Sequence, residues 1–132
     1  MLTKRILILE DDLETVSVIS KALAQYENDN IKNFDIAITI LSEYTQVEEY
    51  ANKLSKDYFD LILLDRDCKA CGSFHVLDFE KFGTDKIISI SSTSQWNAEA
   101  KTRGVEIIVQ KDYANLDQFA QNLAGEIKKI IK

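Results

Sequence analysis

The sequence contains no proline, and it has only four glycines and two cysteines among 132 residues. Without proline, turns must be made by Gly, Asn, Asp and Ser. Two cysteines cannot build a disulfide framework, so we expect a cytoplasmic protein in a reducing compartment. Cationic residues are the minority, with 16 Lys and Arg against 22 Asp and Glu and a net charge of −6. Because such a surface repels phosphate backbones and anionic membranes, we expect no direct binding to nucleic acid or membrane.

Long hydrophobic runs are also absent. The longest aliphatic run has four residues, whereas a membrane-spanning helix needs about 20. The apolar run that follows the first five residues is only four residues long, which is too short for the core of an export signal. The hydrophobic content of 45% is nonetheless enough for a folded core that buries about two-thirds of the unfolded surface. Neither a linker nor a repeat divides the chain, which predicts a single domain over residues 1–132.

Short aliphatic runs alternate with segments of helical periodicity along the whole chain. The runs are Ile6–Leu9, Leu61–Leu64, Ile87–Ile90 and Val105–Val109. A further segment, Phe34–Ile40, alternates apolar and polar residues, which is typical of a strand at the edge of a sheet. The pattern predicts an α/β fold with helices on both faces of a doubly wound, five-stranded parallel sheet. Its expected strand order is 2-1-3-4-5, as in flavodoxin-like (βα)5 folds.

The segments between these runs have apolar residues at helical spacing. We expect a first helix opened by an Asp11-x-x-Glu14 capping pattern and a second opened by Thr45-x-x-Glu48. The last helix has an inward stripe from Leu116 to Ile130. Two weaker patterns predict a short helix that ends near Gly83 and a polar, loosely held helix at Thr93–Arg103.

Polar residues that follow the strands form the candidate site, because ligands in open α/β sheets bind beyond the carboxyl ends of the strands. In the expected order the first and third strands are neighbours, so their acids converge. Three carboxylates within about 4 Å would repel by several kcal/mol per pair at an effective dielectric near 20, and we therefore expect a cation among them. These strand-end residues are Glu10, Asp11 and Asp12, then Asp65 and Asp67, then Ser91 and Ser92, and finally Lys111.

An all-oxygen site with room for water and phosphate suits Mg²⁺. A carboxylate beside Mg²⁺, with a hydroxyl and an ammonium nearby, is equipped to attack a phosphoryl group and to stabilise the charge on its oxygens. Asp65 is the candidate nucleophile, Ser91 the donor to one phosphoryl oxygen, and Lys111 the cation beside another. The candidate metal ligands are Glu10, Asp11, Asp65 and Asp67.

These residues give the sequence a resemblance to the receiver domain of two-component response regulators. The matching pieces are ILILEDD at 6–12, DLILLD at 60–65, Ser91 at the end of IISIS, and Lys111 at the end of GVEIIVQK. The resemblance implies a cytoplasmic switch, not an enzyme, that accepts a phosphoryl group on Asp65 from a sensor histidine kinase or a phosphotransfer protein. It further implies a rearrangement of the face formed by the fourth helix, fifth strand and fifth helix.

The sequence departs from that pattern near the lysine and after the phosphoacceptor. Asp112 stands where the family usually has a cis-proline, Lys69 replaces a common proline, and Ile108 replaces the aromatic rotamer switch. We therefore expect intact phosphorylation chemistry with an unusual readout. Since the chain ends with the predicted last helix, we expect a stand-alone receiver, monomeric or weakly dimeric, that acts by contact with a downstream protein.

Simpler interpretations and other functions stay open. Asp11 and Asp12 are also suited to capping the first helix, and Lys111 alone would be an ordinary surface lysine. The segment LILLDRD also matches the Asp-x-Asp opening of haloacid-dehalogenase-type phosphatases, with Asp65 as nucleophile and Asp67 as acid and base. A third alternative is a binding module that keeps the fold without phosphorylation.

A Cys-x-x-Cys pair, Cys68 and Cys71, follows Asp65 directly. Such a pair can be redox-active or can begin a metal site, with His75 four residues further on as a candidate third ligand. Three ligands do not complete a tetrahedral zinc site, and the chain has no other Cys or His. We therefore favour two small loop residues, with a redox or zinc role as the alternative.

Overall fold

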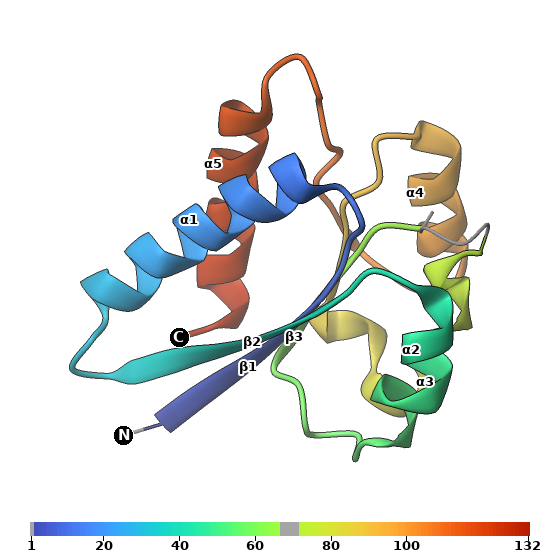
Figure 1. Cartoon of the computed structure of the whole chain (residues 1–132), viewed down its shortest axis with the longest axis horizontal. Coiled ribbons are helices and arrows are strands. Elements are labelled where there is room, and N and C mark those ends of the chain that lie inside the picture. Colours follow the sequence, from blue (N-terminus) through green and yellow to red (C-terminus); the bar gives the residue numbers. More distant parts are fainter. Residues whose placement is uncertain (1, 67–71) are drawn as a thin grey trace.

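The computed structural model describes residues 2–66 and 72–132, and Figure 1 shows strands and helices that alternate along the chain. The elements are β1 (Leu2–Leu9), α1 (Leu13–Asp29), β2 (Phe34–Leu41), α2 (Tyr44–Glu49), β3 (Leu61–Leu64), α3 (Phe79–Phe82), β4 (Ile87–Ser89), α4 (Ser94–Thr102), β5 (Ile107–Ile108) and α5 (Leu116–Ile130). Single 3₁₀ turns lie at Ala51–Lys53, Phe74–Val76 and Thr84–Lys86.

The strands form one parallel sheet of five in the order β2-β1-β3-β4-β5. This confirms the predicted fold class and strand order. β1 and β2 pair over their whole length, from Leu2 opposite Phe34 to Leu9 opposite Leu41. β2 is an edge strand, as its alternating pattern predicts. β1 and β3 are neighbours whose last paired residues are Leu9 and Leu64, so the residues after them lie side by side.

Helices cover both faces of the sheet. α1 and α5 pack on one face, over a core that includes Ile6, Ile8 and Phe119. α2, α3 and α4 lie on the opposite side (Figure 1), where the core includes Leu7, Leu9 and Phe74. Successive residues of β1 thus point to opposite faces and are buried on both, as expected for a central strand of a doubly wound sheet.

Both predicted helix starts are displaced by one or two residues. The N-cap of α1 is Asp12, not Asp11, because the Asp12 carboxylate accepts the backbone N–H of Thr15 at 3.0 Å and its hydroxyl at 2.6 Å. α2 begins after Glu43, whose side chain forms a capping box with Gln46 in place of the expected Thr45 pattern.

Three predicted elements are shorter in the structure than the sequence indicates. The predicted short helix before Gly83 is divided into a 3₁₀ turn and α3, because the Asp78 side chain accepts the backbone N–H of Lys81 and so caps a new helix that begins at Phe79. β5 is shorter than the predicted strand, since the N–H of Val105 bonds back to Ala100 in α4 and does not join the ladder. β4 ends one residue early, at Ser89.

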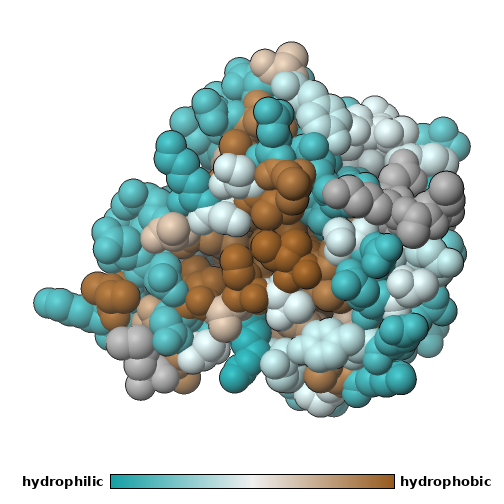
Figure 2. Space-filling model, viewed as in Figure 1, coloured by the Kyte–Doolittle hydropathy of each residue, from teal (hydrophilic) through white to brown (hydrophobic). Residues whose placement is uncertain are grey.

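The face shown in Figure 2 carries a central group of apolar residues between the α1 and α2 regions of Figure 1. The edge strand β2 crosses this face and exposes Ile38 (43%) and Ile40 (40%). Among the described residues, no helix is both long and apolar enough to cross a bilayer.

Candidate functional site

Three carboxylates meet beyond the carboxyl ends of β1 and β3. One oxygen from each of Glu10, Asp11 and Asp65 can be chosen so that all lie within 4.8 Å of one another. Glu10 and Asp65 are nearly inaccessible, with 1% and 7% of their surface exposed. The fourth acid of the predicted set, Asp67, lies outside the described residues.

The backbone fixes these carboxylates in place. The N–H of Asp65 donates to the carbonyl of Leu9 at 3.0 Å, which carries the pairing of β1 and β3 one residue past the last paired positions. The Glu10 carboxylate accepts the backbone N–H groups of Asp11 at 2.9 Å and Asp12 at 3.1 Å. The turn into α1 therefore orients the Glu10 carboxylate.

The Lys111 ammonium reaches this cluster from the segment that follows β5, an edge strand of the sheet. Its Nζ lies 2.5 Å from Glu10 Oε1 and 3.0 Å from Asp65 Oδ2, and the residue is 3% exposed. The backbone N–H of Lys111 donates to the carbonyl of Ser91 at 3.3 Å. This bond joins the segments that follow β4 and β5 and so helps to place the Lys111 side chain beside the acids.

The buried charged groups shift one another's pKa values. Burial raises the pKa of Glu10 to about 8, and the neighbouring Asp65 charge adds to the shift, while the hydrogen bond and the charge of Lys111 oppose it. Burial alone would lower the pKa of Lys111, but the charge of Asp65 and the hydrogen bond to Glu10 outweigh it and raise that pKa. The lysine is therefore a fixed positive charge, and Glu10 is the group with a pKa near neutrality.

The charges of the site leave room for a divalent cation. With all three acids ionised, their charges and the single ammonium of Lys111 leave two negative charges. The donor set is entirely carboxylate oxygen, which suits a hard cation such as Mg²⁺. The residues present therefore fit the magnesium ion that the sequence predicts, and Glu10, Asp11 and Asp65 are the candidate ligands among the described residues.

Ser91 lies two residues after β4, which ends at Ser89, and is buried. Its hydroxyl accepts the backbone N–H of Thr93 at 3.3 Å, ahead of α4. The structure thus brings Glu10, Asp11, Asp65 and Lys111 together and places Ser91 on the adjoining strand end. Asp12, the remaining acid of the first strand end, instead caps α1.

Two residues that the sequence analysis did not select adjoin the site. Arg66 follows Asp65, stacks 3.8 Å from the Trp96 ring centre and forms an ion pair with Glu99 on α4 at 3.2 Å. Asn97, also on α4, is buried and hydrogen-bonded to the end of β4. The position of Arg66 next to Asp65 was a usable signal, whereas nothing local to Asn97 marks it as buried.

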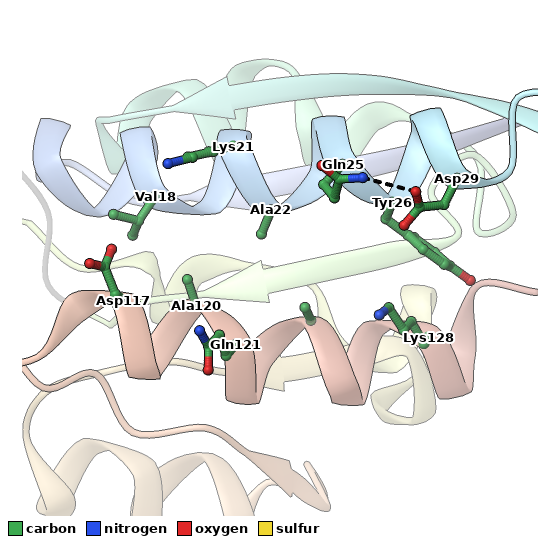
Figure 3. Close-up of a pocket in the computed structure, with 11 residues that line it drawn as sticks. Val18, Lys21, Ala22, Gln25, Tyr26, Asp29, Asp117, Ala120, Gln121 and Lys128 are labelled. Atoms are coloured by element: carbon green, nitrogen blue, oxygen red, sulfur yellow. Dashed lines mark hydrogen bonds between the residues drawn. The ribbon is translucent and has the colours of Figure 1, made fainter.

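A separate groove lies between α1 and α5 (Figure 3), with a volume of about 510 Å³. Ala22 and Ala120 face it, and Lys21, Asp117 and Lys128 stand along it. Among the described residues, those that line the groove belong to these two helices, and none of them is Glu10, Asp11 or Asp65. The groove is therefore a distinct surface feature and no part of the candidate site.

Comparisons with known proteins agree with this fold. The receiver domain of a response regulator from Rhodospirillum rubrum superimposes with a TM-score of 0.68 at 15% identity, covering 95% of this chain and 94% of that one. The bacteriophytochrome response regulator AtBRR gives a TM-score of 0.65 at 15% identity, covering 100% and 96%. No protein-family model and no curated protein matches the sequence. The chain therefore has the fold of response regulator receiver domains, which confirms the predicted resemblance at the level of the fold.

Proposed function

We propose that this chain is a phosphoacceptor signalling domain that takes one phosphoryl group on Asp65 and signals by contact with another protein. The observation that carries the proposal is the meeting of Asp65 with Glu10, Asp11 and the Lys111 ammonium at neighbouring strand ends. Side chains up to 101 positions apart in the sequence converge there. Such a set of acids and a buried lysine matches the requirements of phosphoryl transfer to a carboxylate.

In the proposed reaction, a carboxylate oxygen of Asp65 attacks the phosphorus atom of the donor. A P–O bond to Asp65 forms while the bond between phosphorus and the leaving group breaks, and the leaving group departs with the electron pair of that bond. The Lys111 ammonium holds one phosphoryl oxygen, and the Ser91 hydroxyl donates to another. Bound Mg²⁺ would supply positive charge next to the phosphoryl oxygens, held by Glu10 and Asp11.

The proposed partners follow from the same chemistry. The donor is a sensor histidine kinase or a phosphotransfer protein, and the recipient of the signal is a downstream protein. The chain catalyses at most its own phosphorylation and dephosphorylation. We also propose a cytoplasmic location, a monomeric or weakly dimeric state and a single domain over residues 1–132.

Labelling with a small phosphodonor tests the proposal. Incubation with Mg²⁺ and acetyl phosphate should increase the mass of the intact protein by one phosphoryl group. Asp65→Asn should abolish this increase, whereas Asp60→Asn, at a less buried acid that accepts the N–H of Arg5 at 2.8 Å, should preserve it. Equal labelling of Asp65→Asn and the unaltered protein would overturn the assignment of Asp65.

Two alternatives make different predictions in the same experiment. A haloacid-dehalogenase-type phosphatase would hydrolyse a generic phosphate ester over many turnovers, whereas the proposed switch accepts one group per chain. A phosphorylation-independent module would bind its partner equally well with and without the phosphodonor. The second acid that the phosphatase mechanism needs, Asp67, and the pair Cys68 and Cys71 lie outside the described residues.

A further inference from the structure

A buried amide on α4 connects that helix to the candidate site. Asn97 is 4% exposed, although it lies in a helix whose sequence is mostly polar. Its Nδ2 donates to the carbonyl of Ser91 at 2.9 Å and to Gln110 Oε1 at 3.3 Å, and its Oδ1 accepts the Ser89 hydroxyl at 2.7 Å. One side chain thereby bridges Ser89 in β4, Ser91 two residues beyond that strand, and Gln110 just before Lys111.

These bonds restrict the geometry of the site. A buried amide without partners costs about 1–3 kcal/mol, so the position of Asn97 is tied to the groups that satisfy it. The carbonyl of Ser91 also accepts the backbone N–H of Lys111 at 3.3 Å. The carbonyl of Ser91 is thus held by the lysine segment and by α4, and these two bonds restrict the backbone that carries the Ser91 hydroxyl.

We infer that Asn97 is a positioning residue for phosphoryl transfer: it holds Ser91 so that the Ser91 hydroxyl meets a phosphoryl group on Asp65. This inference rests on the proposed function of the site. Asn97 acts through Ser91 and touches none of the reacting atoms. The bond from Asn97 to Gln110 fixes the orientation of the Asn97 amide. The Ser89 hydroxyl donates to the oxygen of the same amide.

The same contacts make α4 part of the site. Any displacement of Ser91 that accompanies phosphorylation must break the Asn97 bond or move α4 as well. The position of the familiar aromatic switch holds Ile108, a partly buried residue packed against the core. The Asn97 contact therefore offers this chain a physical link between phosphorylation and α4 that needs no aromatic side chain.

The test compares Asn97→Ala with Ser89→Ala as a matched control. Both variants remove a bond within the same buried network, but only the first removes the bond to Ser91. The rate of Asp65 labelling is measured against acetyl phosphate concentration, with Mg²⁺ present and folding checked by circular dichroism. Asn97→Ala should lower the maximal rate about tenfold with little change in the half-saturating concentration, and Ser89→Ala should change the maximal rate less than about twofold.

A double-mutant cycle separates positioning from a structural role. Once Ser91→Ala has removed the hydroxyl, adding Asn97→Ala should slow labelling less than about twofold further. If Asn97→Ala does not fold, Gln110→Ala at an exposed residue removes one bond to the amide and should slow labelling about threefold.

Three results would overturn the inference. These are wild-type labelling of Asn97→Ala, equal slowing by Ser89→Ala, and a full tenfold effect of Asn97→Ala in the Ser91→Ala background. If the unaltered protein takes no label at all, the proposed function fails, and the inference fails with it. Normal labelling of both the unaltered protein and Asn97→Ala leaves the proposed function standing and removes only the role of Asn97.

Discussion

Lys111 is the residue on which the electrostatics of the site depend. Its side chain is completely buried, and its ammonium lies between Glu10 and Asp65. A buried ion pair is not by itself evidence of high stability, because both partners lose hydration. Removal of one partner is a different matter, since it leaves the remaining charge buried and unpaired.

Lys111→Met should therefore destabilise the fold by about 3–5 kcal/mol at neutral pH without Mg²⁺. Urea unfolding followed by circular dichroism measures the change. Lys129→Met removes an exposed lysine that pairs with Glu126 at 3.2 Å and should cost less than about 0.5 kcal/mol. If the two substitutions cost the same, Lys111 does not neutralise the buried acids.

The raised pKa of Glu10 predicts a dependence of stability on pH. Burial and the Asp65 charge move this pKa from 4.5 to about 8 in the folded chain, so between these values the folded state binds more protons than the unfolded state. The stability from Glu10 is fully present below pH 4.5 and is lost as pH rises through about 8.

Urea unfolding between pH 5 and 9 at constant ionic strength, without Mg²⁺, tests this dependence. The fall in stability should be smaller in Glu10→Gln, which cannot ionise. It should also be smaller with saturating Mg²⁺, because the cation compensates the ionised carboxylate. Identical pH profiles for Glu10→Gln and the unaltered protein would contradict the assignment.

At the scale of the elements, α1 separates two adjacent acids into different roles. Asp12 is its N-cap, with bonds to the backbone and hydroxyl of Thr15, whereas Asp11 joins the acidic cluster. Sequence spacing alone allowed either acid to cap the helix. The turn after β1 decides the question because it points the Asp11 carboxylate toward Asp65.

Substitutions at these two acids should have opposite consequences. Asp12→Ala should destabilise the chain by about 1 kcal/mol, the usual cost of losing a cap. Asp11→Ala should leave stability nearly unchanged or increase it, because it relieves repulsion among carboxylates, and it should weaken Mg²⁺ binding. Urea unfolding and calorimetric titration with Mg²⁺ make the comparison. Equal loss of stability in both variants would show that the two acids act alike.

At the scale of the whole molecule, the two edges of the sheet differ. β5 has two paired residues, whereas β2 has eight and exposes Ile38 and Ile40. Long apolar edges invite pairing with other chains. Part of this edge is blocked from within, because the Glu27 carboxylate on α1 accepts the backbone N–H of Ile36 at 2.6 Å.

Glu27→Ala should therefore increase self-association. The substitution frees a backbone donor beside the exposed isoleucines and also removes a negative charge that opposes aggregation. Light scattering at rising protein concentration measures the effect. Glu14→Ala, at an exposed acid of the same helix, removes the same charge without touching the edge. If both variants associate to the same extent, net charge and not edge protection is responsible.

Local patterns predicted where the five strands lie, although β4 and β5 are shorter than expected, and they placed Glu10, Asp11 and Asp65 at strand ends. Each aliphatic run overlaps a strand, and the residues that follow a strand lie at the carboxyl edge of a parallel sheet. The cap of α1 was harder to predict, because Asp11 and Asp12 have the same side chain. Only the turn after β1 decides which of the two caps the helix. Asn97 was missed because its burial depends on Ser89, Ser91 and Gln110, which lie in other segments.

The sequence by itself determined the α/β class, the edge position of β2 and the set of acids, hydroxyl and lysine at the strand ends, because these follow from short-range periodicity. Only the tertiary structure decided that Lys111 is enclosed between Glu10 and Asp65, that Asp12 and not Asp11 caps α1, and that α4 is joined to Ser91 through Asn97. The physical reason is that burial and charge pairing depend on segments far apart in the chain, and no local pattern records which of them meet.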